Sequence, residues 1–386
     1  MKKRTLKFNE NGKFRILVLT DLHEYKSDDK ETQNKTEDAL LLVETAVKAL
    51  SPDLVVYNGD NAFGKTEEDL KETIDAITKT VRELNIPFTM VLGNHEHDDR
   101  ELPPEMPVKI FSSYENSLVR EDKKGISGYA NHYISIKGKG NKNKYLLFFI
   151  DSGKSRSDFP ELSGYDWVKD DQIEWFEKVC DQFKEKNNNE YVPAIVFQHM
   201  PVTEIYNLLD EVSGLEVSGA IKGQGMFSNK YFVLKEGVKG DLLEGPCPPD
   251  YNNGQFDSWK CHGVKGAFFG HDHKNDFEGE LDGVLLAQIK GTGFNGYSDG
   301  IKTGLKLITI NENDIPDFET KDYYFNDFGL VSKSAVLPHQ IMTEEQKKNV
   351  KNTAKKIGLG VAAVTAAAAV GTVVKKIIKK KQEDKL

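Results

Sequence analysis

Short apolar runs in the first hundred residues alternate with longer segments that suit helices. Residues 14–20, 53–58 and 88–92 are rich in large apolar residues, which is typical of strands buried on both faces. Residues 34–50 carry apolar residues at helical spacing, and a second helix is expected near 66–84. This alternation predicts parallel strands joined by right-handed crossovers, and therefore an α/β fold.

The rest of the chain continues the pattern, with one irregular region. The predicted elements are strands at 131–136, 144–150, 194–197 and 267–269, a helix at 170–187, and hairpin strands at 276–289 and 303–311. Residues 220–263 hold Gly, Pro, Asn and aromatic residues without clear periodicity. A segment of this length without regular structure is often functional, so we expect a long loop or a small cap there.

Polar residues follow five of the predicted strands at their carboxyl ends. The five signatures are Asp21-x-His23, Gly59-Asp60, Gly93-Asn94-His95, His199 and Gly270-His271-Asp272-His273. One Asp or His at a strand end is usually a cap or turn residue. Ligands, however, collect at the carboxyl ends of strands in open α/β sheets. Five such ends therefore predict one convergent site.

The chemistry of these side chains favours metal binding. They are imidazoles, carboxylates and one amide without a thiolate, which suits a catalytic metal better than a structural zinc. Seven ligand side chains exceed the need of one tetrahedral ion but suit two ions that share a carboxylate. Paired metals about 3.5–4 Å apart can hold the attacking and leaving oxygens of a displacement at phosphorus, and they activate a bridging water.

In this order the motifs resemble those of the calcineurin-like metallophosphoesterase superfamily, over about residues 14–310. The longer strings GNHEHD, VFQHMP and FFGHDHKNDFEG are similar to a subgroup related to the purple acid phosphatases. The resemblance implies a two-sheet αββα sandwich with the site at one edge. It also implies a phosphoesterase with two metal ions, which would be Mn, Fe or Zn.

The resemblance also implies a role for each site residue. Asp21, His23 and His273 would hold the first metal, Asn94, His199 and His271 would hold the second, and Asp60 would bridge both. His95 would protonate the leaving group or stabilise the phosphoryl oxygens. Further residues that could contact substrate are Asn61, which suits a turn equally well, Asn275, which could instead orient His273, and Tyr297.

Two departures from related families narrow the prediction. True purple enzymes place a metal-bound tyrosinate three residues after the bridging Asp, where this chain has Phe63, and they lack the histidine found here at His23. The resemblance therefore implies a non-purple type. The Arg that follows the bridging Asp in Ser/Thr protein phosphatases is absent after Asp60, which disfavours that class.

The leading hypothesis is hydrolysis of phosphomonoesters by attack of a metal-bridging hydroxide, on a phosphorylated small molecule or protein. A phosphodiesterase for cyclic nucleotides, glycerophosphodiesters or nucleic acid would use the same ligands, and a non-catalytic relic that acts as a binding protein is a third possibility. Net charge is −9, yet residues 346–386 hold eleven lysines and two acids, so the rest is near −18. This argues against extended nucleic acid as a partner.

The C-terminal segment differs from the domain predicted for residues 1–330. Residues 331–386 are expected to form a linker and a basic, Ala-rich helical tail. Residues 357–374 are uncharged but only weakly apolar, and lysines flank them on both sides. We favour contact of 346–386 with an anionic membrane surface or a partner over a span, with a frayed extension as the alternative.

Cellular location is predicted from the N-terminus and the cysteines. The N-terminus lacks the apolar run of a secretory signal. Cys180, Cys247 and Cys261 show no CxxC spacing, so reduced thiols in the cytoplasm are expected, with membrane association through the tail. A Cys247–Cys261 disulfide in an oxidising compartment is the alternative.

Overall fold

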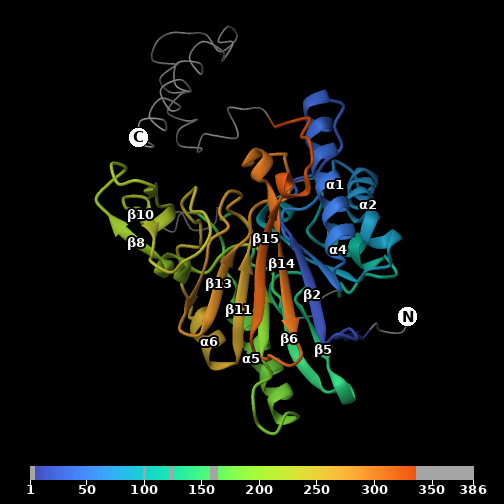
Figure 1. The fold of residues 1–386 in the computed structure, drawn as a ribbon, viewed down its shortest axis with the longest axis vertical. Coiled ribbons are helices and arrows are strands. Elements are labelled where there is room, and N and C mark those ends of the chain that lie inside the picture. Colours follow the sequence, from blue (N-terminus) through green and yellow to red (C-terminus); the bar gives the residue numbers. More distant parts are fainter. Residues whose placement is uncertain (1–4, 99–100, 121–124, 157–163, 336–386) are drawn as a thin grey trace. The chain divides into compact units, whose positions relative to one another are not determined.

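The computed structural model describes residues 5–98, 101–120, 125–156 and 164–335. Residues Met1–Ser334 form one compact unit, in which two β-sheets pack face to face (Figure 1). Of the tail predicted at 331–386, only residues 331–335 are described. None of the helices in the described ranges combines the length and apolar character that crossing a bilayer requires.

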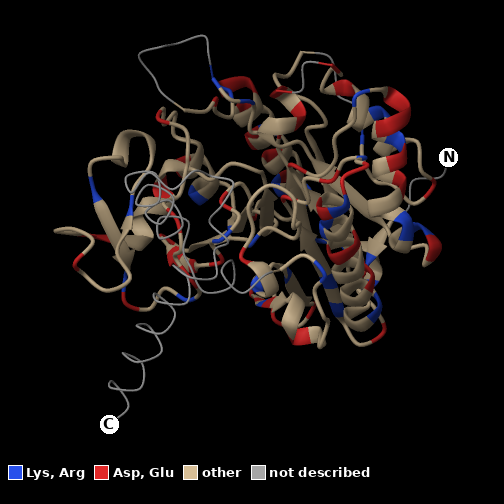
Figure 2. Ribbon diagram, turned by 90° about the horizontal axis from the view of Figure 1, so that it is seen from above, with Lys and Arg blue, Asp and Glu red and all other residues tan. Residues whose placement is uncertain are grey.

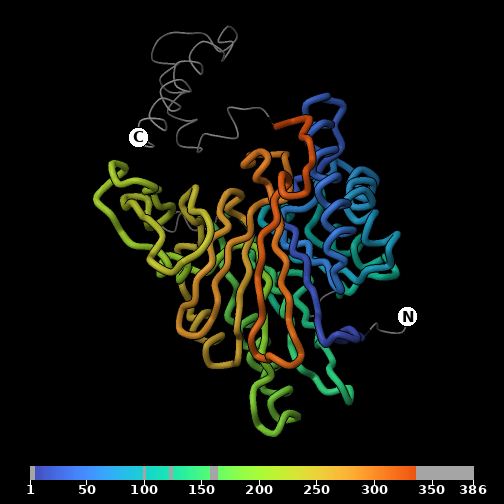
Figure 3. The backbone as a smooth tube through the Cα atoms, in the orientation of Figure 1, coloured from blue at the N-terminus to red at the C-terminus, as the bar shows by residue number. Residues whose placement is uncertain are grey.

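One sheet holds the strands of the first hundred residues. Its order is β15 (Phe318–Tyr324), β14 (Gly304–Asn311), β2 (Lys13–Leu19), β3 (Leu54–Asn58) and β4 (Phe88–Val91). Strands β2, β3 and β4 are parallel, and β14 is antiparallel to both β2 and β15. Helices α1 (Lys30–Leu50) and α2 (Glu67–Glu83) connect the parallel strands, as the apolar pattern predicted. In Figure 3 the orange C-terminal strands run beside the blue β2.

The second sheet has seven strands. Its order is β1 (Leu6–Lys7), β5 (His132–Lys137), β6 (Asn143–Phe149), β7 (Ala194–Phe197), β11 (Val264–Phe269), β13 (Val284–Gln288) and β12 (Glu278–Leu281). Helix α5 (Asp170–Glu185) lies between β6 and β7 in the chain, and α6 (Gln255–Cys261) precedes β11. Both predicted hairpin segments are strands, but in different sheets: 276–289 forms the hairpin β12–β13, whereas 303–311 pairs with β15 and β2.

An apolar core between the two sheets holds the layers of the fold together. Alternate side chains of β2 and β3, including Ile16 and Val56, pack against the second sheet at residues such as Phe197. On the outer face of the first sheet, the Tyr57 hydroxyl of β3 donates to the Ile77 carbonyl of α2 at 2.9 Å. Helices α5 and α6 cover the outer face of the second sheet through residues that include Phe176 and Trp259. The predicted αββα sandwich is confirmed.

Residues 220–263 are more regular than their composition predicted. Strand β10 (Tyr231–Leu234) pairs with β8 (Leu209–Val212) and β9 (Ile221–Lys222) in a small antiparallel sheet, and helix α6 belongs to the same region. The remaining short helices are α3 (Asn94–Asp98), α4 (Glu105–Ser112) and 3-10 turns at Lys139–Asn141, Thr203–Leu208, Gly225–Phe227, Gly300–Lys302 and Phe325–Phe328.

Charged residues of both signs are interspersed over the described part of the chain (Figure 2). Most are exposed, but two of the buried lysines, Lys290 and Lys306, form ion pairs with acids that are buried or partly buried. Lys306 of β14 binds Glu278 of β12 and Asp322 of β15 at 2.8 Å each, so this ion pair joins the two sheets at their edges. Lys290 binds Asp276 in the same way, at 3.1 Å.

Candidate metal centre

The five polar signatures lie at the carboxyl ends of β2, β3, β4, β7 and β11, as the sequence predicted. Their imidazole and carboxylate donors form three overlapping groups, in each of which the donor atoms lie within 4.8 Å of one another. The groups are Asp21, His23 and His273; Asp60, His199 and His271; and His23, Asp60 and His95. The structure thus brings together every predicted His and Asp ligand.

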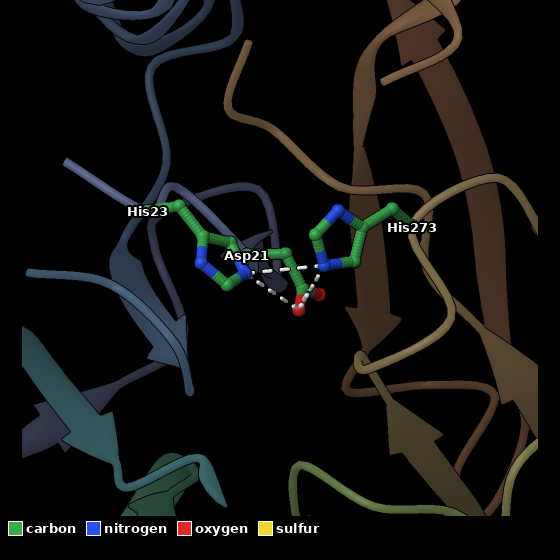
Figure 4. Close-up of side chains that lie close together, drawn as sticks. All are labelled: Asp21, His23 and His273. Atoms are coloured by element: carbon green, nitrogen blue, oxygen red, sulfur yellow. Dashed lines mark hydrogen bonds and ion pairs between the residues drawn. The ribbon is translucent and has the colours of Figure 1, made fainter. Parts of the chain in front are cut away.

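The first group joins the end of β2 to the loop after β11. The His23 and His273 rings flank the Asp21 carboxylate, with their Nε2 atoms directed toward it (Figure 4). The two Nε2 atoms lie 3.1 Å apart, and Asp21 Oδ1 lies 3.3 Å from that of His273 and 3.8 Å from that of His23. These three donors face one point, as the ligands of a single cation do.

Asp60, a member of the second group, also faces His23 of the first. Its Oδ2 lies 3.2 Å from His199 Nε2 and 3.6 Å from His23 Nε2. His199 Nε2 is also 3.7 Å from Asp21 Oδ1. A carboxylate in this position can serve two ions at once, which is the bridging role that the resemblance implied for Asp60.

Backbone carbonyls set the orientation of two of the histidines. His199 Nδ1 lies 2.9 Å from the Asn58 carbonyl, and His273 Nδ1 lies 2.7 Å from the Tyr297 carbonyl. In each ring Nδ1–H donates to the carbonyl, which leaves the Nε2 lone pair for the centre. The hypothesis that Asn275 orients His273 is therefore wrong. Asn275 is fully buried and binds the backbone of Glu244 instead.

Three buried donor atoms in the predicted ligand set have no hydrogen-bond partner. They are Asp21 Oδ1, Asn94 Oδ1 and His199 Nε2. A buried polar atom without a partner is costly and rare. Cations would satisfy these atoms, and the oxygen and imidazole donors suit a pair of transition-metal ions. The donor set therefore fits a binuclear metal site.

The loops that carry the predicted ligands have little conformational freedom. Asp21, His23, Asp60 and His271 all have left-handed backbone conformations, with φ between 49° and 73°. Such strain in non-glycine residues persists only where the surroundings hold it, and it concentrates at functional sites. At Gly93 a Cβ would lie 2.1 Å from Asp60 Oδ1, so the G-N-H motif needs a glycine to admit the carboxylate.

Glu96 holds two of these loops together, a role that no local sequence pattern indicated. Its buried carboxylate accepts hydrogen bonds from the backbone N–H groups of Asp60 at 2.8 Å, Asn61 at 2.7 Å and Gly93 at 2.8 Å. Burial, and then the charge of Asp60, raises the pKa of Glu96 to about 7. In the string GNHEHD it looks like an ordinary surface acid, because only the folded loops reveal its three donors.

The carboxylates of the centre raise the affinity of two histidines for protons, which compete with a metal ion for the same nitrogen atoms. Burial alone would lower the pKa of His199, but the charges of Asp60 and Asp21 outweigh it and raise that pKa to about 10. The same balance, dominated by Asp21, raises the pKa of His273 to about 9. Burial lowers the pKa of His271 to about 3. A cation that binds here must displace protons from His199 and His273 at neutral pH.

His95 differs from the predicted ligands because its side chain is 56% exposed. Its backbone N–H donates to Asp60 Oδ1 at 2.9 Å, and its Nε2 lies 4.0 Å from Asp60 Oδ2. The Phe63 ring lies 6.0 Å from the His95 ring and 5.6 Å from the His23 ring, between centroids. A phenyl group therefore borders the centre at the position of the tyrosinate of purple enzymes.

A pocket of about 270 Å³ opens over the centre. Its lining includes Asp60, His95, His271 and His273, and residues from other segments that the sequence did not single out: Tyr165, Gln224, Glu244 and Gly245. Cys247 also lines it, and Cys247 and Cys261 are both free thiols.

Two of the predicted substrate residues take different places. The Tyr297 ring lines the pocket and stacks on His273, with centroids 4.0 Å apart and planes 2° apart. Asn61 is fully buried, and neither polar atom of its side chain has a hydrogen-bond partner. The position of Tyr297 agrees with a substrate contact, whereas Asn61 and Asn275 lie beneath the surface.

Residues 14–275 match the family model described as calcineurin-like phosphoesterase. The chain is 28% identical over 336 residues to "Probable inactive purple acid phosphatase 29" of Arabidopsis thaliana, which covers 81% of this chain and 80% of that protein. It is also 28% identical over 334 residues to "Probable inactive purple acid phosphatase 14" of the same plant, covering 76% and 74%. A solved dimetal phosphatase from Danio rerio aligns with 81% of this chain and 99% of its own at 11% identity, with a TM-score of 0.48. The match over most of its length shows that this chain belongs to the calcineurin-like phosphoesterase family.

Proposed function

We propose that the chain is a phosphoesterase that requires two metal ions and hydrolyses phosphomonoesters. The observation that carries the proposal is the set of three unpartnered buried donors, Asp21 Oδ1, Asn94 Oδ1 and His199 Nε2, at strand ends gathered around Asp60. A fold that needed only stability would not keep these atoms unsatisfied in its interior. The metals would be Mn, Fe or Zn.

Each side chain of the centre has a role in this reaction. Asp21, His23 and His273 would hold one ion, Asn94, His199 and His271 the other, and Asp60 both. The chemistry that a bound pair of cations supplies is polarisation of the phosphoryl oxygens and a lowered pKa for water. Asp60 links the two groups of ligands, because its Oδ2 faces His199 of one group and His23 of the other.

His95 is placed to act on the leaving group. Its imidazole is the most exposed of the groups around Asp60, and it lines the pocket into which an ester would enter. From there Nε2 can give a proton to the departing alcohol oxygen, or stabilise negative charge on a phosphoryl oxygen. The pocket of about 270 Å³ suits a small ester or a phosphorylated side chain better than a nucleic-acid backbone.

A second candidate is a protein that binds without catalysis, because the relatives from Arabidopsis thaliana are named probably inactive. Two measurements test both candidates. The first is metal analysis of the purified chain. The second compares turnover of an aryl monoester and a bis-aryl diester with Mn, Fe, Zn and Co in turn. We expect two metal ions per chain and faster turnover of the monoester. His95→Ala should keep the metal and lose most turnover, whereas the control His262→Ala should keep both. Absence of metal and of turnover would instead favour the binding protein.

A further inference from the structure

The wall of the pocket has an unusual charge for a site that receives phosphate esters. Outside the five signatures, the charged residue among its described lining residues is the acid Glu244, and none of those lining residues is Lys or Arg. Asp272, between the two histidines of the last signature, adds a second acid. The phosphoryl group can be held by metal ions, and outside the five signatures the described lining offers the leaving group one acid and neutral side chains.

Two tyrosine rings stand over the centre on opposite ligand groups. Tyr297 stacks on His273 of the first group, and Tyr165 contacts His271 of the second edge to face, with centroids 4.4 Å apart and planes 88° apart. Both rings line the pocket. Aromatic faces attract cations through the ring quadrupole, most strongly where water is excluded.

Glu244 is fixed next to one of these rings. Its Oε1 accepts a hydrogen bond from the Tyr297 hydroxyl at 3.1 Å and one from the Lys274 backbone N–H at 2.8 Å. Asp272, like Glu244, lines the pocket beside this ring. The Glu244 carboxylate therefore lies beside an aromatic surface of the pocket, where it can pair with a cation bound against the ring.

We propose that the pocket selects phosphate esters of amino alcohols, whose leaving group carries an ammonium or a quaternary ammonium. This inference rests on the proposed phosphoesterase function and names its substrate class. The phosphoryl end lies at the metal centre, and the ammonium lies against Tyr165 and Tyr297 with Glu244 as its counter-charge. Esters with a second phosphate or a carboxylate in the leaving group are disfavoured by the same acids.

The test compares two isosteric substrates. Choline phosphate and 3,3-dimethylbutyl phosphate have the same shape, but a neutral carbon replaces the ammonium nitrogen in the second. With metal-loaded protein, kcat/KM from phosphate release should favour choline phosphate about tenfold, as cation–π and charge contacts of this kind allow. Equal values for the two esters would overturn the inference.

Variants assign that preference to residues. Glu244→Gln should reduce the ratio of the two kcat/KM values to about one, and Tyr165→Leu should reduce it several-fold. Glu236→Gln removes an exposed acid that does not line the pocket, and it should leave the ratio unchanged. An undiminished ratio in both Glu244→Gln and Tyr165→Leu would show that neither side chain recognises the cation.

Two further measurements separate this inference from the function on which it rests. Turnover of p-nitrophenyl phosphate without preference between the isosteres would leave the phosphoesterase intact and remove the ammonium site. If no ester is hydrolysed, the proposed function fails, and calorimetric titration of the metal-loaded chain with the two isosteres decides the inference alone. Tighter binding of choline phosphate would support it, and equal binding would overturn it.

Discussion

The floor of the pocket and its wall are built in different ways. The floor is the candidate metal centre, formed by the residues that follow β2, β3 and β4 of one sheet and β7 and β11 of the other. Its side chains receive hydrogen bonds from more than one loop. Asp21 Oδ2, for example, accepts from the Thr20 hydroxyl at 2.8 Å and from the His271 backbone at 3.0 Å. The wall consists of residues on short segments, and Tyr297 meets Glu244 through one hydrogen bond of 3.1 Å. Strand ends can preserve one chemistry, while residues on the connecting segments can change the substrate without altering it.

The floor variant with the largest expected effect is Asp60→Asn. An amide removes the negative charge that faces His199 and His23, so we expect turnover of an aryl phosphate to fall by about 10³-fold or more. Circular dichroism should show an unchanged fold, and metal analysis should show a loss of bound ion. The control Asp257→Asn alters an exposed carboxylate on α6 and should keep full activity. Near-normal turnover in Asp60→Asn would contradict the role of the Asp60 carboxylate as a bridge between two metal ions.

Gly93→Ala tests whether the floor tolerates a single added carbon. The new Cβ would lie 2.1 Å from Asp60 Oδ1, so the carboxylate must move. Displacement of a reacting group by about 1 Å costs about 10²-fold in rate, and we expect a loss of that size in kcat. Gly237→Ala is the control, because its Cβ meets no heavy atom within 4 Å and only its backbone conformation, with φ of 88°, is penalised. Equal activity of the two variants would show that the floor is less rigid than argued.

Glu96→Gln loosens the floor without touching a ligand side chain. The amide keeps one oxygen but presents an NH₂ to backbone N–H groups that now donate to Oε1 and Oε2. We expect about 1–3 kcal/mol less free energy of unfolding. Metal affinity should fall about 10- to 100-fold, as is usual when support behind ligands is lost. A stability loss with unchanged metal affinity would limit Glu96 to a structural role.

The same contrast explains what the sequence could predict. The convergence of the floor residues was predictable because each predicted ligand follows closely on a buried apolar run, such as 53–58 before Asp60, so a local pattern determined its position. Strand β15 was missed because its segment, Phe-Glu-Thr-Lys-Asp-Tyr-Tyr, is mostly polar and has no fully buried side chain. A strand at the edge of a sheet can be polar on both faces, so its sequence lacks the apolar pattern by which strands are recognised.

Of the wall, the sequence indicated Tyr297 and the region 220–263, but it did not indicate Tyr165 or Glu244 individually, because their places depend on contacts between distant segments. Tyr165 is placed at the pocket by its ring contact with His271, and Glu244 by its hydrogen bond with Tyr297. The two partners are more than fifty residues apart in each case. Asn275 shows the opposite error, since closeness in sequence to His273 suggested a contact that the direction of its side chain does not make.

A pH series probes how the floor is attached to the second sheet. His97 Nε2 lies 2.8 Å from Asp151 Oδ1, at the end of β6. Burial alone would lower the pKa of His97, but the charge and hydrogen bond of Asp151 outweigh it and raise that pKa. The pair therefore adds stability that is complete below about pH 6.5, the unfolded value, and is lost as pH rises through the folded pKa. Urea unfolding in chelator should show that His97→Gln is most destabilising at low pH, with the difference shrinking toward pH 9. A difference that grows with pH would contradict this assignment.

The smallest expected effect belongs to the wall, in Tyr297→Phe. The variant keeps the ring that stacks on His273 and removes only the hydroxyl that donates to Glu244. The hydroxyl also accepts a long hydrogen bond of 3.4 Å from the His273 backbone N–H. Loss of these two contacts corresponds to about 0.5–1.5 kcal/mol in total, so we expect KM for an aryl phosphate to rise by no more than about tenfold. Metal content should not change, because the backbone carbonyl of residue 297, not its side chain, binds His273 Nδ1. A loss of metal in Tyr297→Phe would contradict the distinction between wall and floor, because it would show that a wall side chain is needed for metal binding.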